Sequence, residues 1–152
     1  FILKDDLKGP NVTEEQVLAA TKAIAPAIEI IDSRITDWKF KFEDTVADNG
    51  SSAGAIVGEL ADVPSYEELG QIEVIASRNG QQFDQGMSSA VMGNPAKAVA
   101  WLANMLSEYD ITLKAGQFIL AGAITAAVPF DAGDVFEVDY GKYGKVTVTF
   151  TE

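Results

Sequence analysis

One short segment constrains this chain more than any other, the apolar run from Ala25 to Ile31, which contains a single carboxylate, Glu29. The length and composition of the run predict a buried strand. An unpaired, ionised carboxylate in such a place costs on the order of several kcal/mol unless a cation or a hydrogen-bond donor meets it. The segment therefore predicts either a binding site or a structural ion pair.

Charged residues follow this strand closely, and they include Asp32, Arg34, Asp37, Asp44 and Asp48. The structural alternative is that Glu29 pairs with Arg34 or Lys41 and only closes an ion pair. Side chains alternate between the two faces of a strand, so Glu29 and Arg34 would point apart. The pattern alone leaves the binding site and the ion pair equally open.

Composition excludes several classes of function. The chain has 152 residues, enough for one domain, and a net charge of −12 without a cluster of Lys or Arg, which argues against a nucleic-acid partner. Cysteine and histidine are both absent, which excludes disulfides, a thiolate nucleophile and a Ser-His-Asp triad within this chain. A bound metal would need oxygen ligands, which favours Mg²⁺, Mn²⁺ or Ca²⁺.

The sequence shows neither a membrane span nor a signal peptide. The most apolar stretch, residues 118–130, is short and is broken by Gly122 and Pro129. We therefore expect no membrane partner and a cytoplasmic location, with which the lack of cysteine is compatible. The chain begins Phe-Ile-Leu-Lys, which resembles the middle of a strand, so we expect further residues upstream.

Local signals predict a β-rich α+β fold in a single domain, residues 1–152. Thr13 with Gln16, and Ser65 with Glu68, fit capping boxes, and Asn94 with Pro95 begins the clearest helix. The predicted helices are 17–24, a short one after 65, and a mostly buried one over 95–109. The predicted strands are 1–4, 27–33, 53–57, 118–121, and the hairpins 72–77 with 81–84 and 135–140 with 146–151. We expect Trp38 and Trp101 to lie in the core.

Two loops have the composition of possible binding segments. Residues 48–52 (Asp-Asn-Gly-Ser-Ser) form a predicted loop between strands. Residues 122–129 contain small side chains, which would let a ligand approach the backbone, and Thr125 supplies a hydroxyl group. For the second loop, a tight turn packed on the sheet is the favoured interpretation of the pattern alone.

Taken together, the segments resemble the 2-keto-4-pentenoate hydratase / 4-oxalocrotonate decarboxylase family, part of the fumarylacetoacetate hydrolase-like superfamily. The matching pieces are F-I-L-K-x-D-L-x-G-P at 1–10, V-L-A-A-T at 17–21, P-A-I-E-I-I-D-S-R-I-x-D-W-K at 26–39, D-T-V-A-D-N-G-S-S at 44–52, G-N-P-A-K-A-V-A-W-L-A-N at 93–104 and K-A-G-Q-F-I-L-A-G-A-I-T-A-A-V-P at 114–129. The resemblance covers essentially the whole chain.

The resemblance implies a fumarylacetoacetate hydrolase-like fold with mixed sheets and a few packed helices. It also implies a Mg²⁺- or Mn²⁺-dependent enzyme that acts on a 2-hydroxy-dienoate in the meta-cleavage degradation of aromatic compounds. A hydratase, which adds water at C4, is favoured over a decarboxylase because the Asp-Trp-Lys at 37–39 resembles the hydratases. A homo-oligomer, or a complex with the decarboxylase or hydratase of the same pathway, is implied as well.

The same resemblance assigns roles to five residues. Glu29 matches the third metal ligand of the family, Ser51 matches a position that binds the acid end of the substrate, and Thr125 would line the pocket. Asp48 and Asn49 would order the loop that carries Ser51. The other two metal carboxylates and the catalytic lysine of the family belong upstream of Phe1, so we expect the 152 residues alone to lack the N-terminal part of the domain and to be inactive.

Two interpretations that assign the chain to other functional classes remain open. The chain could be a non-catalytic partner subunit that keeps the fold without the upstream acids. It could also be a Ca²⁺-binding β-domain, in which case several oxygen ligands must lie within these residues and mutation of Glu29 would lower stability instead of turnover.

Overall fold

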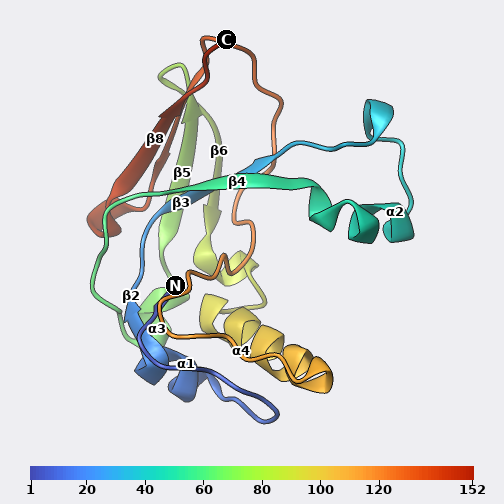
Figure 1. Cartoon of the computed structure of the whole chain (residues 1–152). Helices are drawn as coiled ribbons and strands as arrows, with labels where there is room; N and C mark the ends of the chain where they lie inside the picture. Colours follow the sequence, from blue (N-terminus) through green and yellow to red (C-terminus); the bar gives the residue numbers. More distant parts are fainter.

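The computed structural model describes residues 1–152 and shows three antiparallel sheets, with three of the four α-helices at the bottom of the view and the fourth set apart at the right (Figure 1). The α-helices are α1 (Glu14–Ala20), α2 (Phe42–Ala47), α3 (Tyr66–Leu69) and α4 (Pro95–Leu106). The strands are β1 (Ile2–Leu3), β2 (Thr21–Ala23), β3 (Ala27–Ile31), β4 (Ser52–Val57), β5 (Glu73–Arg78), β6 (Gln81–Met87), β7 (Val135–Asp139) and β8 (Lys145–Thr149). The sheets have the orders β1-β2, β3-β4 and β6-β5-β7-β8.

The hydrophobic core lies where α1 and α4 meet the N-terminal segment and β5. Leu3, Val17, Val74 and Val99 are almost completely buried there. The capping box at the start of α1 is present, because Thr13 Oγ1 accepts from the backbone of Gln16 and the Gln16 side chain accepts from the Thr13 N–H. Local capping thus fixes the start of the helix whose apolar face closes the core.

The segment between the end of β3 and the start of β4, residues 32–51, projects from the body as an arm that carries α2 (Figure 1). In the ribbon of β3 and β4, the register pairs Glu29 with Ala55 and Ile28 with Ile56. No third strand pairs with this ribbon. A lone two-stranded ribbon is marginally stable in water, so the end of the ribbon from which the arm emerges must be held by other interactions.

The α+β fold class and most local signals are confirmed. The Asn79-Gly80 turn joins β5 to β6, both with positive φ, as a type I′ turn requires. Asn94 caps α4 by accepting from the Ala96 N–H at 3.0 Å, with Pro95 in the first helical position. The final hairpin, β7 with β8, also forms.

Three predictions of secondary structure are wrong. The first helix ends at Ala20, and the residues that follow form β2, because β1 offers a pairing partner across Leu3 and Thr21. Residues 118–121 form only an isolated bridge between Phe118 and Ile2. The expected mixed sheets are not found, since all strand pairings are antiparallel.

Burial was also predicted wrongly at several places. β3 is not fully buried, since Glu29 is exposed and the other four residues of the strand are only partly buried. Trp38 and Trp101 are 54% and 53% exposed, so neither lies in the core. The prediction that α4 is mostly buried is confirmed, since six of its twelve residues are buried and only Lys97, Trp101 and Met105 are exposed. The second capping box is half-formed: Ser65 caps α3, whereas the Glu68 side chain pairs with Lys142.

None of the four α-helices combines the length and apolar content that crossing a membrane requires.

Candidate functional site at the base of the arm

Asp48 is the centre of a hydrogen-bond network where the arm joins β4. It is 9% exposed. Its two carboxylate oxygens accept from Arg34 Nε at 2.5 Å, Ser51 Oγ at 2.9 Å, Ser33 Oγ at 3.1 Å and the Arg34 N–H at 3.2 Å. One carboxylate therefore joins the residues after β3 to the turn before β4.

Arg34 extends the same network to the backbone. Its Nη2 donates to the carbonyl oxygens of Asp48 at 2.7 Å and Ser52 at 3.2 Å. A planar guanidinium with several N–H donors suits this task, since it can bind a carboxylate and carbonyl groups at once. The Arg34 side chain, which follows β3, thereby holds the turn before β4 and the first residue of β4.

The network sets the protonation state of Asp48. The hydrogen bond from Arg34, followed by those from Ser51 and Ser33, lowers the pKa of Asp48 from its usual 3.8 to about 2, although desolvation opposes the shift. The carboxylate is therefore ionised at neutral pH. The structural ion pair of this segment is thus Arg34 with Asp48, and the alternative in which Glu29 pairs with Arg34 or Lys41 is not found.

Glu29 lies on β3 with an exposed side chain and forms no hydrogen bond or ion pair. The argument that it is buried and needs a cation is therefore wrong, but its carboxylate is free to coordinate one. No group of three acidic side chains in this chain could hold a metal ion. The fit to a metal is thus partial, because these residues offer one free carboxylate and not a complete ligand set.

The predicted loop at 48–52 is a tight turn that includes a short 3₁₀ helix, Asn49–Ser51. Asn49, Gly50 and Ser51 all have positive φ, at 55°, 65° and 59°. Such a run is costly for residues with a Cβ and persists only where surrounding contacts hold it. Ser51 is 2% exposed and is held by Asp48, whereas the exposed Asn49 side chain forms no hydrogen bond.

Thr125 lies in a different segment, which is held against β6. The Ala126 N–H donates to Asp84 Oδ2 at 2.7 Å, and a Cβ added at Gly86 would come within 2.6 Å of the Ile124 carbonyl oxygen. The close approach of two backbones thus requires a glycine in β6. Thr125 itself is half-buried and forms no hydrogen bond with the network around Asp48.

Sequence reasoning placed Asp48 and Ser51 correctly in one loop but missed the roles of Arg34 and Ser33. A usable signal was present. Arg34 is the first basic residue after the strand, and it precedes a segment in which Asp48 lies beside Ser51. The partner considered for Arg34 was Glu29 on the preceding strand, and not Asp48 across the turn.

Two pockets elsewhere in the chain, of about 320 and 310 Å³, include none of the predicted site residues. The first lies beside the N-terminal turn and α1. The second lies between α3 and the turn after β7, and it is bordered by Tyr143, whose hydroxyl group is buried without a hydrogen-bond partner. Neither of these two pockets is therefore the predicted site.

Almost the whole sequence of this chain matches one known family of proteins. Residues 2–151 match the family described as fumarylacetoacetate (FAA) hydrolase C-terminal, so the chain belongs to this family. The family resemblance drawn from the sequence motifs is thereby confirmed.

The individual relatives are named by a particular reaction, which the family description is not. The chain is 48% identical over 152 residues to 2-hydroxyhexa-2,4-dienoate hydratase of Comamonas testosteroni, covering 100% of this chain and 58% of that protein. It is 41% identical to 2-oxo-hept-4-ene-1,7-dioate hydratase of Escherichia coli, covering 99% and 58%. The structure of 4-oxalocrotonate decarboxylase from Pseudomonas putida G7, complexed with magnesium and adipate, superposes with a TM-score of 0.91 at 39% identity, covering 98% and 57%. The chain spans somewhat more than half the length of these relatives.

Proposed function

We propose that this chain belongs to a divalent-metal-dependent hydratase, which adds water to a 2-hydroxy-2,4-dienoate to give a 4-hydroxy-2-oxo acid in the degradation of aromatic compounds. The observation that carries the proposal is the 48% identity to a dienoate hydratase over the whole chain. The Mg²⁺ named with the solved decarboxylase supports a divalent metal, Mg²⁺ or Mn²⁺, as the cofactor.

Glu29 would supply one ligand of that metal, because its carboxylate is exposed and unpaired at the base of the arm. The remaining ligands and the catalytic acid–base groups would come from residues outside these 152, because no cluster of three acids lies within them. A bound divalent cation would supply Lewis-acid stabilisation of negative charge on the 2-oxygen of the substrate. We therefore propose that the 152 residues alone do not turn over substrate.

Ser51 would bind the acid end of the substrate. Its hydroxyl has a single proton, which is donated to Asp48 in this structure. On binding, that proton would turn toward the substrate carboxylate, and Asp48 would keep its donors from Arg34 and Ser33. Asp48 thus orders the turn and makes the hydroxyl proton available at little cost, while Asn49 keeps the turn in its left-handed conformation.

Thr125 would line the substrate pocket from the segment held on β6. The neighbouring glycine and alanine side chains at 121–123 are small, so a planar, unsaturated acid could approach the backbone there. The half-buried Thr125 hydroxyl would be the only polar side chain in the segment 121–128.

A 4-oxalocrotonate-type decarboxylase is the second candidate. The chain is 42% identical to 4-oxalocrotonate decarboxylase of Pseudomonas sp. (strain CF600), close to the figures for the hydratases. Both reactions would delocalise charge onto the same 2-oxygen, either before protonation and water addition or on loss of CO₂. A non-catalytic partner subunit is the candidate from another class, favoured by the incomplete ligand set of this chain.

The test is the mass of the product formed by the chain extended to the length of its relatives, with Mg²⁺ present. It would be offered 2-hydroxypenta-2,4-dienoate and, separately, 4-oxalocrotonate. Gain of one water by the dienoate supports the hydratase, and loss of CO₂ from 4-oxalocrotonate supports the decarboxylase instead. Absence of turnover and of metal binding would support the non-catalytic subunit and contradict the role of Glu29.

A further inference from the structure

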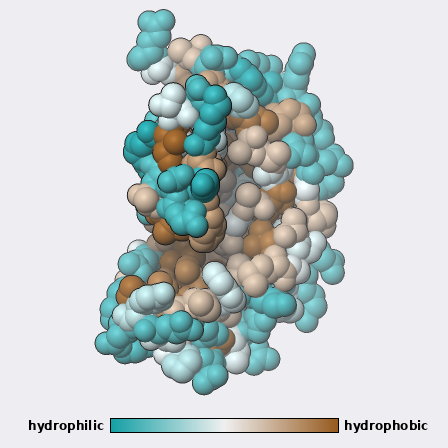
Figure 2. All heavy atoms as spheres, turned by 90° about the vertical axis from the view of Figure 1, so that its right-hand side faces the viewer, coloured by the Kyte–Doolittle hydropathy of each residue, from teal (hydrophilic) through white to brown (hydrophobic).

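Residues 115–130, which we call the Thr125 segment, offer a ligand apolar surface and no charge. The segment contains no Asp, Glu, Lys or Arg. Its residues Phe118, Leu120 and Phe130 are 54%, 38% and 39% exposed. Figure 2, which faces the side from which the arm projects, shows a hollow with apolar walls between the upper and lower parts of the molecule. Burying a charge against an apolar surface is costly, so the Thr125 segment suits an uncharged part of a ligand.

Asp84, on β6, brings a negative charge to the part of this segment that includes Thr125. The half-buried carboxylate accepts from the Ala126 N–H at 2.7 Å through Oδ2 and from the Gln85 N–H at 2.8 Å through Oδ1. The nitrogen of Ala126 belongs to the peptide bond that follows Thr125. The carboxylate of Asp84 therefore lies directly beside Thr125.

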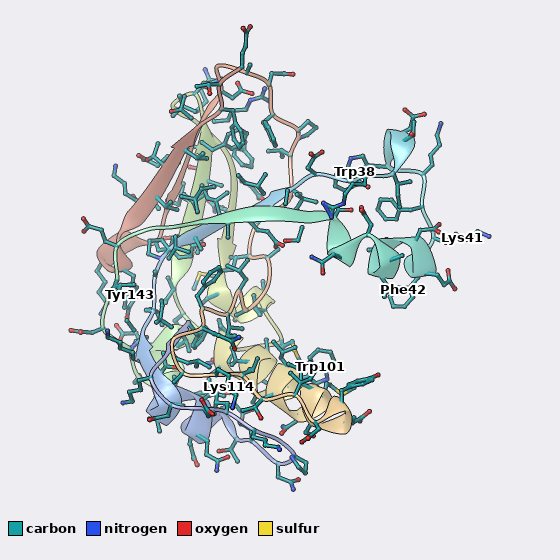
Figure 3. The ribbon with its side chains drawn as sticks, in the orientation of Figure 1. Trp38, Lys41, Phe42, Trp101, Lys114 and Tyr143 are labelled. Atoms are coloured by element: carbon teal, nitrogen blue, oxygen red, sulfur yellow. The ribbon has the colours of Figure 1, made fainter.

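No basic side chain of this chain neutralises Asp84, which forms no ion pair. Arg78, the basic residue nearest to it in the sequence, is bound to Asp134 with 2.5 Å between Nη2 and Oδ2. Lys114, the last charged residue before the Thr125 segment, is bound to Asp6 at 2.9 Å. Figure 3 shows Lys114 in the lower part of the molecule near α4, whereas β6 lies above it (Figure 1). The charge of Asp84 is therefore uncompensated within these residues.

The hydrogen bond from Ala126 does not by itself require a charged acceptor. An asparagine in place of Asp84 could accept from the same N–H through its amide oxygen. The carboxylate adds a negative charge, which repels a second negative charge several ångströms away, most strongly where side chains exclude water. A substrate with a carboxylate near Thr125 would meet this repulsion, whereas a substrate with an uncharged end would not.

We propose that Asp84 determines substrate specificity by discriminating against dicarboxylates, so that the end of the substrate away from the 2-oxo acid carries no charge. The inference rests on the proposed function, in which Ser51 binds the acid end of the substrate and Thr125 lines the rest of the pocket. It favours a monocarboxylic 2-hydroxy-dienoate. It also disfavours 4-oxalocrotonate, which is a dicarboxylate, and with it the decarboxylase candidate.

The test compares kcat/KM for two substrates of the chain extended to the length of its relatives, with Mg²⁺ present. 2-Hydroxyhexa-2,4-dienoate ends in a methyl group, whereas 2-oxo-hept-4-ene-1,7-dioate ends in a second carboxylate. We expect the wild type to prefer the monoacid. Asp84→Asn keeps an acceptor for the Ala126 N–H but removes the charge, so it should lower the ratio of the two kcat/KM values, monoacid to diacid, at least about fivefold. An unchanged ratio would overturn the proposal.

Asp6→Asn is the matched control. The Asp6 carboxylate also accepts from a backbone N–H of the Thr125 segment, that of Ala115 at 2.9 Å, but it does so at the far end of the segment from Thr125. Asp6→Asn changes the net charge by the same amount, and its ratio should equal that of the wild type. A ratio lowered as much as in Asp84→Asn would assign the effect to net charge and overturn the role of Asp84. Circular dichroism verifies that both variants are folded.

Ionic strength provides a second measurement, which needs no substitution. The preference of the wild type for the monoacid should weaken between about 0.05 M and about 0.5 M salt, because counterions screen the repulsion between like charges. A preference that salt leaves unchanged, or a wild type that prefers the diacid, would overturn the proposal. Turnover of neither substrate would overturn the proposed function and this inference with it, whereas turnover with the same ratio in wild type and Asp84→Asn overturns the role of Asp84 alone.

Discussion

Arg34 and Asp48 form the ion pair on which the base of the arm depends, with 2.5 Å between Nε and Oδ1. The Asp48 side chain is 6% exposed, whereas the Arg34 side chain is 54% exposed. Because Asp48 also accepts from Ser33 and Ser51, this one pair links the end of β3 to the turn that places Ser51. The geometry of the proposed substrate-binding residue therefore rests on an arginine that contacts no proposed substrate atom.

Replacing Arg34 with methionine should destabilise the arm and raise the pKa of Asp48, because the largest cause of the lowered pKa is removed. The shielded carboxylate would then lack its cation, which is costlier than losing an exposed pair. We expect a lower urea midpoint for Arg34→Met. Lys39→Met, which breaks an exposed pair with Asp37, should change stability by less than about 1 kcal/mol. Equal midpoints for the two variants would contradict this account.

Low pH should lower the stability of the fold because two carboxylates become protonated. Hydrogen bonds from Arg34 and Arg78, respectively, lower the pKa values of Asp48 and Asp134 from 3.8 to about 2. A folded-state pKa below the unfolded value stabilises the protein above the unfolded pKa, and that stability is lost as the pH falls through the folded pKa. We therefore expect the melting temperature to fall between about pH 4 and pH 2.

The matched variant for this pH dependence is Asp48→Asn, which keeps the shape of the side chain but cannot titrate. Its melting temperature should be lower than that of the wild type at pH 7 and should depend less on pH between about 4 and 2. A pH dependence as steep as that of the wild type would show that Asp48 contributes nothing to acid sensitivity.

Glycine at position 86 should be essential for the segment that carries Thr125. In Gly86→Ala the new Cβ would lie 2.6 Å from the Ile124 carbonyl oxygen, so one backbone must move, at a cost of about 1–3 kcal/mol. Gly54→Ala in β4 meets nothing within 4 Å and should be close to neutral. Chemical denaturation of both variants measures the difference, and similar losses would contradict the close approach.

Truncation of the buried Leu3 should lower the free energy of unfolding far more than truncation of an exposed leucine. Leu3 is 1% exposed, so Leu3→Ala should cost about 2–5 kcal/mol of unfolding free energy. Leu60 is 56% exposed, and Leu60→Ala should stay within about 0.5 kcal/mol of the wild type. Guanidinium unfolding of both variants measures the two losses of unfolding free energy. Comparable losses would contradict the position of the core around Leu3.

The parts of the fold that could be predicted from sequence are those decided by a few neighbouring residues. Asn79-Gly80 specifies its turn through positive φ, and Asn94-Pro95 specifies the start of α4 through a cap and a preset φ. The end of α1 could not be predicted in this way. Whether Thr21 continues the helix or joins a sheet depends on β1, which lies 18 residues earlier in the chain.

The burial of β3 and of Trp101 was predicted wrongly because the burial of a residue depends on which other parts of the protein cover it. The apolar run around Glu29 predicts a buried strand equally well whether its neighbours belong to this chain or to another surface. Likewise, Trp101 on α4 has the pattern of a core residue, yet 53% of it is exposed here. The pair of Arg34 with Asp48 was missed for a related reason, because the turn that brings Asp48 to Arg34 has three successive positive φ values, which composition does not reveal.

The measurement that tests the central claim most directly is the affinity for Mg²⁺ of the chain extended to the length of its relatives, by titration calorimetry. Wild type is compared with Glu29→Gln and with Glu73→Gln, a control that changes an exposed strand glutamate in β5. If Glu29 is a metal ligand, Glu29→Gln should weaken Mg²⁺ binding at least about tenfold while Glu73→Gln binds as the wild type does. Equal affinity of Glu29→Gln and wild type would contradict the assignment of Glu29.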